Sequence, residues 1–97
     1  MKAIFIVYNQ THTESIEYLF DKLEIRGFTR WTGLMGHGSV EGLPHMNTHT
    51  WPEQNTASLI VVEDAVVERV LDGVRKLDEL NREVGIRAFV WNIETMY

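Results

Sequence analysis

Histidines are the residues of this sequence best suited to coordination chemistry, and it contains four of them: His12, His37, His45 and His49. His45 and His49 are four positions apart, the spacing that places two imidazoles on one face of a helical turn, and Pro44 is a residue type that can begin such a turn. His37 would supply a third nitrogen. Imidazole ligands suit zinc, copper or nickel. The pattern fits a transition-metal site and also fits solvated loop histidines, because no cysteine or acidic residue completes a known ligand spacing.

The histidine at position 37 stands between two glycines, Gly36 and Gly38. Glycines allow unusual backbone angles and the close approach of another group. Backbone amides exposed in this way can hold an anion such as a phosphate. A tight turn explains the same pattern without any ligand, so both interpretations stay open.

No arrangement of residues suggests catalysis. The neighbours of Ser39 and Ser58 do not form a nucleophile elbow. The carboxylates are spread over predicted helix surfaces, where they usually serve solubility, and Glu14 is better explained as a helix-capping residue than as a general base. We therefore expect a protein that is not an enzyme.

The composition predicts one soluble domain over residues 1–97, with 44% hydrophobic and 24% charged residues. A formal net charge of −5 argues against nucleic-acid binding. No apolar run approaches the ~20 residues of a membrane helix, so we expect no membrane insertion. The apolar run at residues 4–8 is too short for a signal peptide, and cysteine is absent, which together favour the cytoplasm.

Two all-apolar runs, at residues 4–8 and 59–62, predict strands buried on both faces. The mixed segment 28–35 predicts an edge strand, and residues 86–94 predict the last strand. A helix is expected over about 12–26, with Thr11 and Glu14 as its capping box and Gly27 as its end. A second helix is expected from its cap at Asp64 to about residue 84, ended by Gly85.

This βαββαβ order predicts an α+β, ferredoxin-like fold: an antiparallel sheet of order 4-1-3-2 with two helices on one face. The first and third strands are interior in that order, and they are the two all-apolar ones. The topology also brings three connections to one end of the sheet, at residues 9–11, 36–55 and 81–85. Because helices cover one face only, the other apolar face predicts self-association.

The segment Phe28-Thr-Arg-Trp-Thr-Gly-Leu-Met-Gly-His-Gly38 resembles the second strand and glycine-x-glycine loop base of the PII-like superfamily, and the resemblance covers essentially the whole chain. It implies a homotrimer that binds nucleotides in clefts between subunits. The 36–55 loop would correspond to a shortened T-loop that reports to a protein partner such as a membrane transporter. Gly36 and Gly38 match the glycines beside the nucleotide phosphates, and Arg82 and Arg87 are the nearby phosphate partners.

The resemblance also carries differences. Val40 stands where classical members have the glutamine that helps hold 2-oxoglutarate and magnesium. The similar CutA-type metal-tolerance proteins are linked to divalent metals. Our leading hypothesis is therefore a signalling protein that senses an adenine nucleotide or a metal. The alternative is a zinc- or copper-binding protein that uses His37, His45 and His49, and a third is a structural oligomer without ligand.

Overall fold

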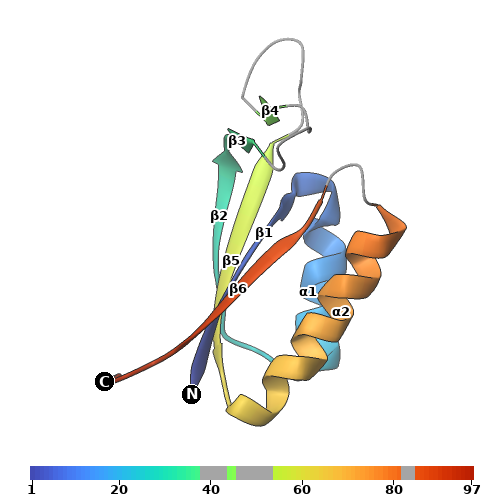
Figure 1. Ribbon diagram of the computed structural model, residues 1–97. Helices are drawn as coiled ribbons and strands as arrows, with labels where there is room; N and C mark the ends of the chain where they lie inside the picture. The colour runs from blue at the N-terminus through green and yellow to red at the C-terminus, as the bar shows by residue number, and fades with distance from the viewer. Residues whose placement is uncertain (38–43, 46–53, 82–84) are drawn as a thin grey trace.

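The computed structural model describes residues 1–37, 44–45, 54–81 and 85–97, and these form a sheet layer and a helix layer (Figure 1). The elements follow the chain as β1 (Lys2–Asn9), η1 (Gln10–His12), α1 (Thr13–Lys22), β2 (Thr29–Leu34), β3 (Gly36–His37), β4 (Pro44–His45), β5 (Asn55–Val62), η2 (Asp64–Val66), α2 (Val67–Leu80) and β6 (Arg87–Asn92).

The main sheet has the order β2-β5-β1-β6, and each neighbouring pair is antiparallel. Counted in chain order, this is the 4-1-3-2 order of the ferredoxin-like prediction, which is confirmed. β3 and β4 form a separate two-stranded ribbon beyond the end of β2. Both helices lie on the same face of the main sheet (Figure 1).

The core lies between the sheet and the helices. Side chains alternate between the two faces of a strand, so every second residue of β1 points toward the helices: Ile4, Ile6 and Tyr8 are at most 1% exposed. From α1 and α2, residues at helical spacing pack against them: Ile16, Phe20, Val70 and Val74. Thr56 and Ser58 of β5 are buried in the same layer.

The first helix differs from the prediction at both ends. Asn9 caps the short η1 before it, since its Oδ1 accepts a hydrogen bond from the Thr11 amide at 2.9 Å. No side chain caps α1 itself, so the expected Thr11 and Glu14 capping box is wrong. It ends at Lys22 instead of near residue 26, because Glu24 adopts a left-handed φ of 60°. Gly27 therefore does not end the helix.

The second helical region also differs. Asp64 begins the short η2, where no side chain caps the helix, and its carboxylate lies 3.1 Å from the amino group of Met1. α2 ends at Leu80, four residues early, and Gly85 instead adopts a φ of +61° before β6. β5 begins at Asn55, four residues before the predicted start at residue 59.

The face of the sheet opposite the helices carries large apolar side chains. From the register, Phe5, Trp31, Phe89 and Trp91 share this face, and we call it the open face. Trp31, Phe89 and Trp91 are 42%, 53% and 49% exposed, and the rings of Phe5 and Trp31 lie 5.9 Å apart. As predicted, the helices leave an apolar face uncovered within one chain.

None of the helices in the described ranges is long and apolar enough to cross a membrane.

Candidate functional site

The predicted convergence of connections at one end of the sheet is confirmed for the described residues. The register pairs Asn9 at the end of β1 with Asn55 at the start of β5, and Asn55 also pairs with Leu34 at the end of β2. Arg87, at the start of β6, pairs with Val7 near the same end. Figure 1 shows the ends of β1 and β2 and the starts of β5 and β6 at this end of the sheet.

Gly36 is brought to this end by an irregularity in β2. Trp31 pairs with Ala57 and Leu34 pairs with Asn55. The chain therefore advances three residues in β2 but only two in β5 between these pairs, so β2 contains one extra residue. This is a β-bulge, and Gly33 supplies its left-handed backbone at a φ of +68°. Gly36 itself is not among the positive-φ glycines. A turn that demands a left-handed glycine therefore does not explain Gly36.

Gly36 lies beside the first residue of β5. A Cβ added at Gly36 would lie 3.4 Å from the side-chain nitrogen of Asn55, and a Cβ at Gly33 would lie 3.4 Å from the side-chain oxygen of Gln54. The backbone of Gln54 also accepts a hydrogen bond from the Gln10 amide at 2.8 Å. The residues at the start of β5 thus contact both the chain that follows β2 and the connection after β1.

Arg87 borders a hollow of about 260 Å³ between α2 and β6. Its lining is apolar at Leu71, Val74, Ile86 and Ala88, with Arg75, Asp78 and Arg87 at the rim. The guanidinium of Arg87 donates to the Ile86 carbonyl at 3.0 Å, and the Asp78 carboxylate accepts from the Ile86 amide at 2.8 Å. These bonds fix the start of β6 and leave an exposed arginine at the mouth of the hollow.

Gly36 and Arg87 are not brought together within one chain. Gly36 follows β2 and Arg87 begins β6, the two opposite edges of the main sheet. With β5 and β1 between these edges and strands spaced by about 4.8 Å, the edges are about 14 Å apart. A small ligand that touches both residues needs two copies of the chain.

The family model for the nitrogen regulatory protein P-II matches residues 1–97. This chain belongs to the P-II family.

Solved structures share this fold. CPII from Thiomonas intermedia K12, a nitrogen regulatory PII-like protein bound to ADP, AMP and bicarbonate, has a TM-score of 0.78 and 22% identity, covering 99% of this chain and 92% of its own. A second CPII structure, bound to ADP and bicarbonate, has a TM-score of 0.78 and 22% identity, covering 95% of this chain and 84% of its own. At this identity the likeness concerns the fold. No curated protein matches the sequence.

In this P-II family member the histidine prediction finds no support. Pro44–His45 is a strand, so the expected helical turn that begins at Pro44 is wrong. The ribbon pairs Gly36 with His45 and His37 with Pro44. His49 lies outside the described residues, and within them no three histidine or acidic side chains gather as a metal site. The predicted phosphate contacts at Gly38 and Arg82 also lie outside the described residues.

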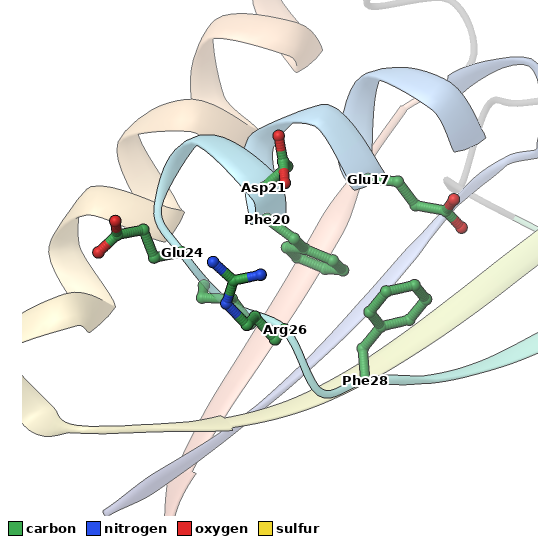
Figure 2. Close-up of a pocket in the computed structure, with 7 residues that line it drawn as sticks. Glu17, Phe20, Asp21, Glu24, Arg26 and Phe28 are labelled. Carbon is green, nitrogen blue, oxygen red and sulfur yellow. The ribbon is translucent and has the colours of Figure 1, made fainter.

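A second hollow of about 260 Å³ lies at the other end of α1, away from Gly36 and Arg87. Figure 2 shows the rings of Phe20 and Phe28, 5.4 Å apart, with Asp21, Glu24 and Arg26 around them. The turn at Glu24 sends the chain back across the end of α1 and creates this hollow. Its acidic rim has no further feature that points to a ligand.

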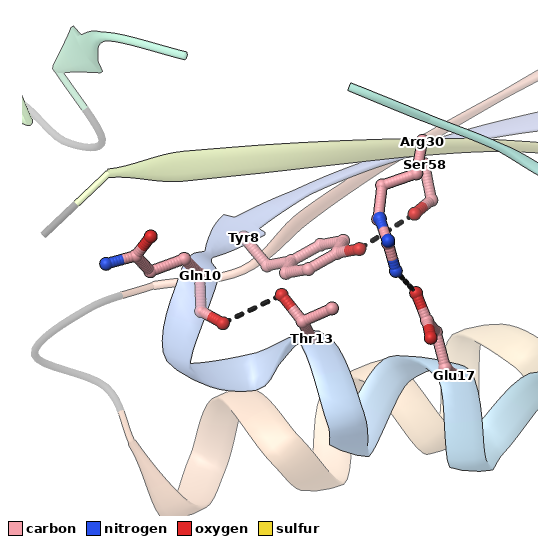
Figure 3. Close-up of polar contacts among 6 residues, drawn as sticks. All are labelled: Tyr8, Gln10, Thr13, Glu17, Arg30 and Ser58. Carbon is pink, nitrogen blue, oxygen red and sulfur yellow. Dashed lines mark hydrogen bonds and ion pairs between the residues drawn. The ribbon is translucent and has the colours of Figure 1, made fainter. Parts of the chain in front are cut away.

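The polar contacts beneath the sheet are structural (Figure 3). The buried hydroxyls of Tyr8 and Ser58 share a hydrogen bond of 2.8 Å, and Arg30 of β2 pairs with Glu17 of α1. Burial raises the pKa of Tyr8 above its ordinary value of 10.0, against the smaller lowering effects of the Ser58 hydrogen bond and the Arg30 charge.

Sequence reasoning missed the residues that build the loop base: Asn9, Gly33, Gln54 and Asn55. A signal was present, because Asn9 follows an apolar run and Gln54-Asn55 precedes one. Amide side chains at the ends of central strands are suited to tying connections together. The prediction overlooked them because it began the third strand at residue 59.

Proposed function

We propose that this P-II family protein senses an adenine nucleotide in clefts between the subunits of a homotrimer, and that residues 36–55 report occupancy to a protein partner such as a membrane transporter. The observation that carries the proposal is the family match over residues 1–97. The CPII structures that share its fold are bound to ADP, AMP or both. We propose a cytoplasmic, regulatory role without catalysis.

The open face supports the trimer. Trp31, Phe89 and Trp91 are about half exposed on one sheet face, and burying apolar surface contributes roughly 25 cal/mol per Å². Contact between copies through this face removes the aromatic rings from water. Association of copies through the open face is the simplest way to bury the apolar surface that one chain leaves exposed.

The opposite positions of Gly36 and Arg87 support a cleft between subunits. If the β2 edge of one copy approaches the β6 edge of the next, the backbone at Gly36 and the guanidinium of Arg87 face one ligand. Backbone amides and an arginine are suited to phosphate groups. The apolar hollow beside Arg87 is suited to packing against the rest of a nucleotide.

Binding of ADP and AMP, measured by isothermal titration and by thermal shift, tests the proposal. We expect the wild type to bind ADP and its melting temperature to rise with ADP concentration. Arg87→Ala should weaken ADP binding about tenfold or more, the scale of one charge-assisted hydrogen bond. Arg69→Ala, which removes an exposed arginine of α2 outside the site, is the matched control.

Failure of the wild type to bind ADP and AMP would refute the nucleotide proposal. Equal losses in the Arg87 and Arg69 variants would refute the assigned role of Arg87. The same thermal-shift assay with Zn²⁺ and Cu²⁺ tests the histidine prediction, because a metal held by His37, His45 and His49 raises the melting temperature of the wild type and not that of a His45→Ala, His49→Ala variant.

A further inference from the structure

Asn55 occupies the point where the ends of three strands meet. It is the ladder partner of Asn9 in β1 and of Leu34 in β2, so both neighbouring strands flank it. The residue is 8% exposed. A buried amide side chain is costly unless it is hydrogen-bonded, so a residue of this type at this place indicates a specific structural demand.

The bulge in β2 makes Gly36 a neighbour of Asn55. A shift of one residue in register moves every following side chain to the opposite face of a strand. β2 has one extra residue between Trp31 and Leu34, so the side chains after Gly33 point to the opposite face from the one they would occupy in a regular strand. Gly36 then lies beside Asn55: a Cβ at position 36 would be in ordinary van der Waals contact, 3.4 Å from the Asn55 side-chain nitrogen.

Gln54 completes the junction from the other side. Its backbone carbonyl accepts from the Gln10 amide at 2.8 Å, which joins β5 to the connection after β1. Its side-chain oxygen lies 3.4 Å from the position of a Cβ on Gly33. Gly33 and Gly36 thus lie beside Gln54, the residue before β5, and Asn55, its first residue.

We propose that Asn55 is a positioning residue that sets the backbone at Gly36 and so presents the base of the 36–55 loop to the nucleotide. This inference rests on the proposed function and names the residue that couples the ligand to the loop. Asn55 does not touch the ligand. It acts through the backbone of Gly36, which belongs to the proposed phosphate contact.

The two substitutions at position 55 change this packing differently. An alanine removes the amide and leaves Gly36 without the neighbouring side chain. A glutamine keeps the amide but adds one methylene beside the backbone of Gly36.

The test compares Asn55→Ala with Ser58→Ala in the full chain. Ser58 is fully buried on the same strand but faces the helix layer, where it bonds Tyr8, so its loss also removes a buried polar contact. Amide hydrogen exchange in the ligand-free protein reports on Met35, Gly36 and His37. Isothermal titration reports the ADP affinity, and thermal unfolding reports the general loss of stability.

We expect Asn55→Ala to speed exchange at Gly36 and His37 about tenfold and to weaken ADP binding by a similar factor, because the buried side chain beside Gly36 is lost. Ser58→Ala should lower the melting temperature about as much as Asn55→Ala does, but it should change neither the exchange at Gly36 and His37 nor the ADP affinity. Asn55→Gln provides the same comparison if the alanine variant does not fold.

Unchanged exchange at Gly36 in the Asn55 variants, or equal exchange in the Ser58 variant, would overturn the inference. The two proposals fail separately. If the wild type binds no ADP, the proposed function fails, while exchange in the ligand-free protein still decides whether Asn55 sets the loop base.

Discussion

The phenol of Tyr8 is 1% exposed and its hydroxyl bonds Ser58 inside the core. Burial raises its pKa, which makes the neutral phenol the form that the fold requires. A group whose pKa is higher in the folded than in the unfolded state contributes stability that is fully present below the unfolded pKa and is lost as pH rises. Its contribution is therefore present at neutral pH and declines above pH 10.0.

We predict that the free energy of unfolding of the wild type falls as the pH rises above 10.0 and that of Tyr8→Phe falls less. At pH 7 the same substitution should cost about 1 kcal/mol, because the Ser58 hydroxyl loses its partner. Urea titrations at several pH values measure both effects. Equal pH slopes in the two proteins would contradict this assignment, and Tyr18→Phe, at an exposed phenol, is the control.

The predicted strand order 4-1-3-2 placed Gly36 and Arg87 at one end of the sheet and beside its two opposite edges, and the structure confirms that order. The place of Asn55 could not be predicted, because it depends on a bulge at Gly33 and on pairing between residues far apart in sequence. A single glycine in a strand pattern indicates a bulge only weakly.

Among the elements, α1 and α2 are held in contact by one small residue. A Cβ at Gly73 of α2 would lie 2.7 Å from Cδ2 and 3.1 Å from Cγ of Leu19 in α1. The helices therefore approach closely at this point because Gly73 has no side chain. A glycine inside a helix costs roughly 1 kcal/mol relative to alanine, so the close contact offsets a poor helix propensity.

We predict that Gly73→Ala lowers the free energy of unfolding by about 1 kcal/mol, because overpacking costs about 1–3 kcal/mol and exceeds the gain in helix propensity. In a Leu19→Ala background the same substitution should be neutral or stabilising, since the obstructing side chain is gone. Chemical denaturation of the four proteins gives the double-mutant cycle. Additive effects would show that Gly73 and Leu19 do not interact.

The order and type of the main elements could be predicted because hydrophobic periodicity is a local signal. The all-apolar residues 4–8 and 59–62 became the interior strands β1 and β5. The residues at which the helices and strands begin and end were harder to predict. The Glu24 turn ends α1 without a glycine, and Asn9, at the end of β1, caps the short η1 that precedes α1. The polar start of β5 at Asn55 has no apolar pattern and becomes a strand through its two neighbours.

At the scale of the molecule, the open face decides the state of association. We predict that the wild type sediments at about three times the 11.3 kDa of one chain. Trp91→Asp places a charge on the open face, where desolvating it is costly, and should shift the protein toward single chains. Tyr18→Asp, at an aromatic residue that is 69% exposed on α1, is the matched control and should leave the mass unchanged.

Sedimentation equilibrium over a range of concentrations measures these masses. A wild type that stays at 11.3 kDa at micromolar concentration would contradict the trimer. A shift of the Tyr18 variant, with none in the Trp91 variant, would move the interface to the helix layer.

The bulge at Gly33 has a consequence for anyone who builds chimeras from this protein. Suppose that a loop is transplanted from a relative whose second strand lacks the extra residue. The side chains that point outward in the relative would then point toward the sheet in this protein. Deleting one residue between Trp31 and Leu34 should invert the native loop in the same way. A functional graft must therefore begin upstream of Trp31 and carry the irregular segment with it.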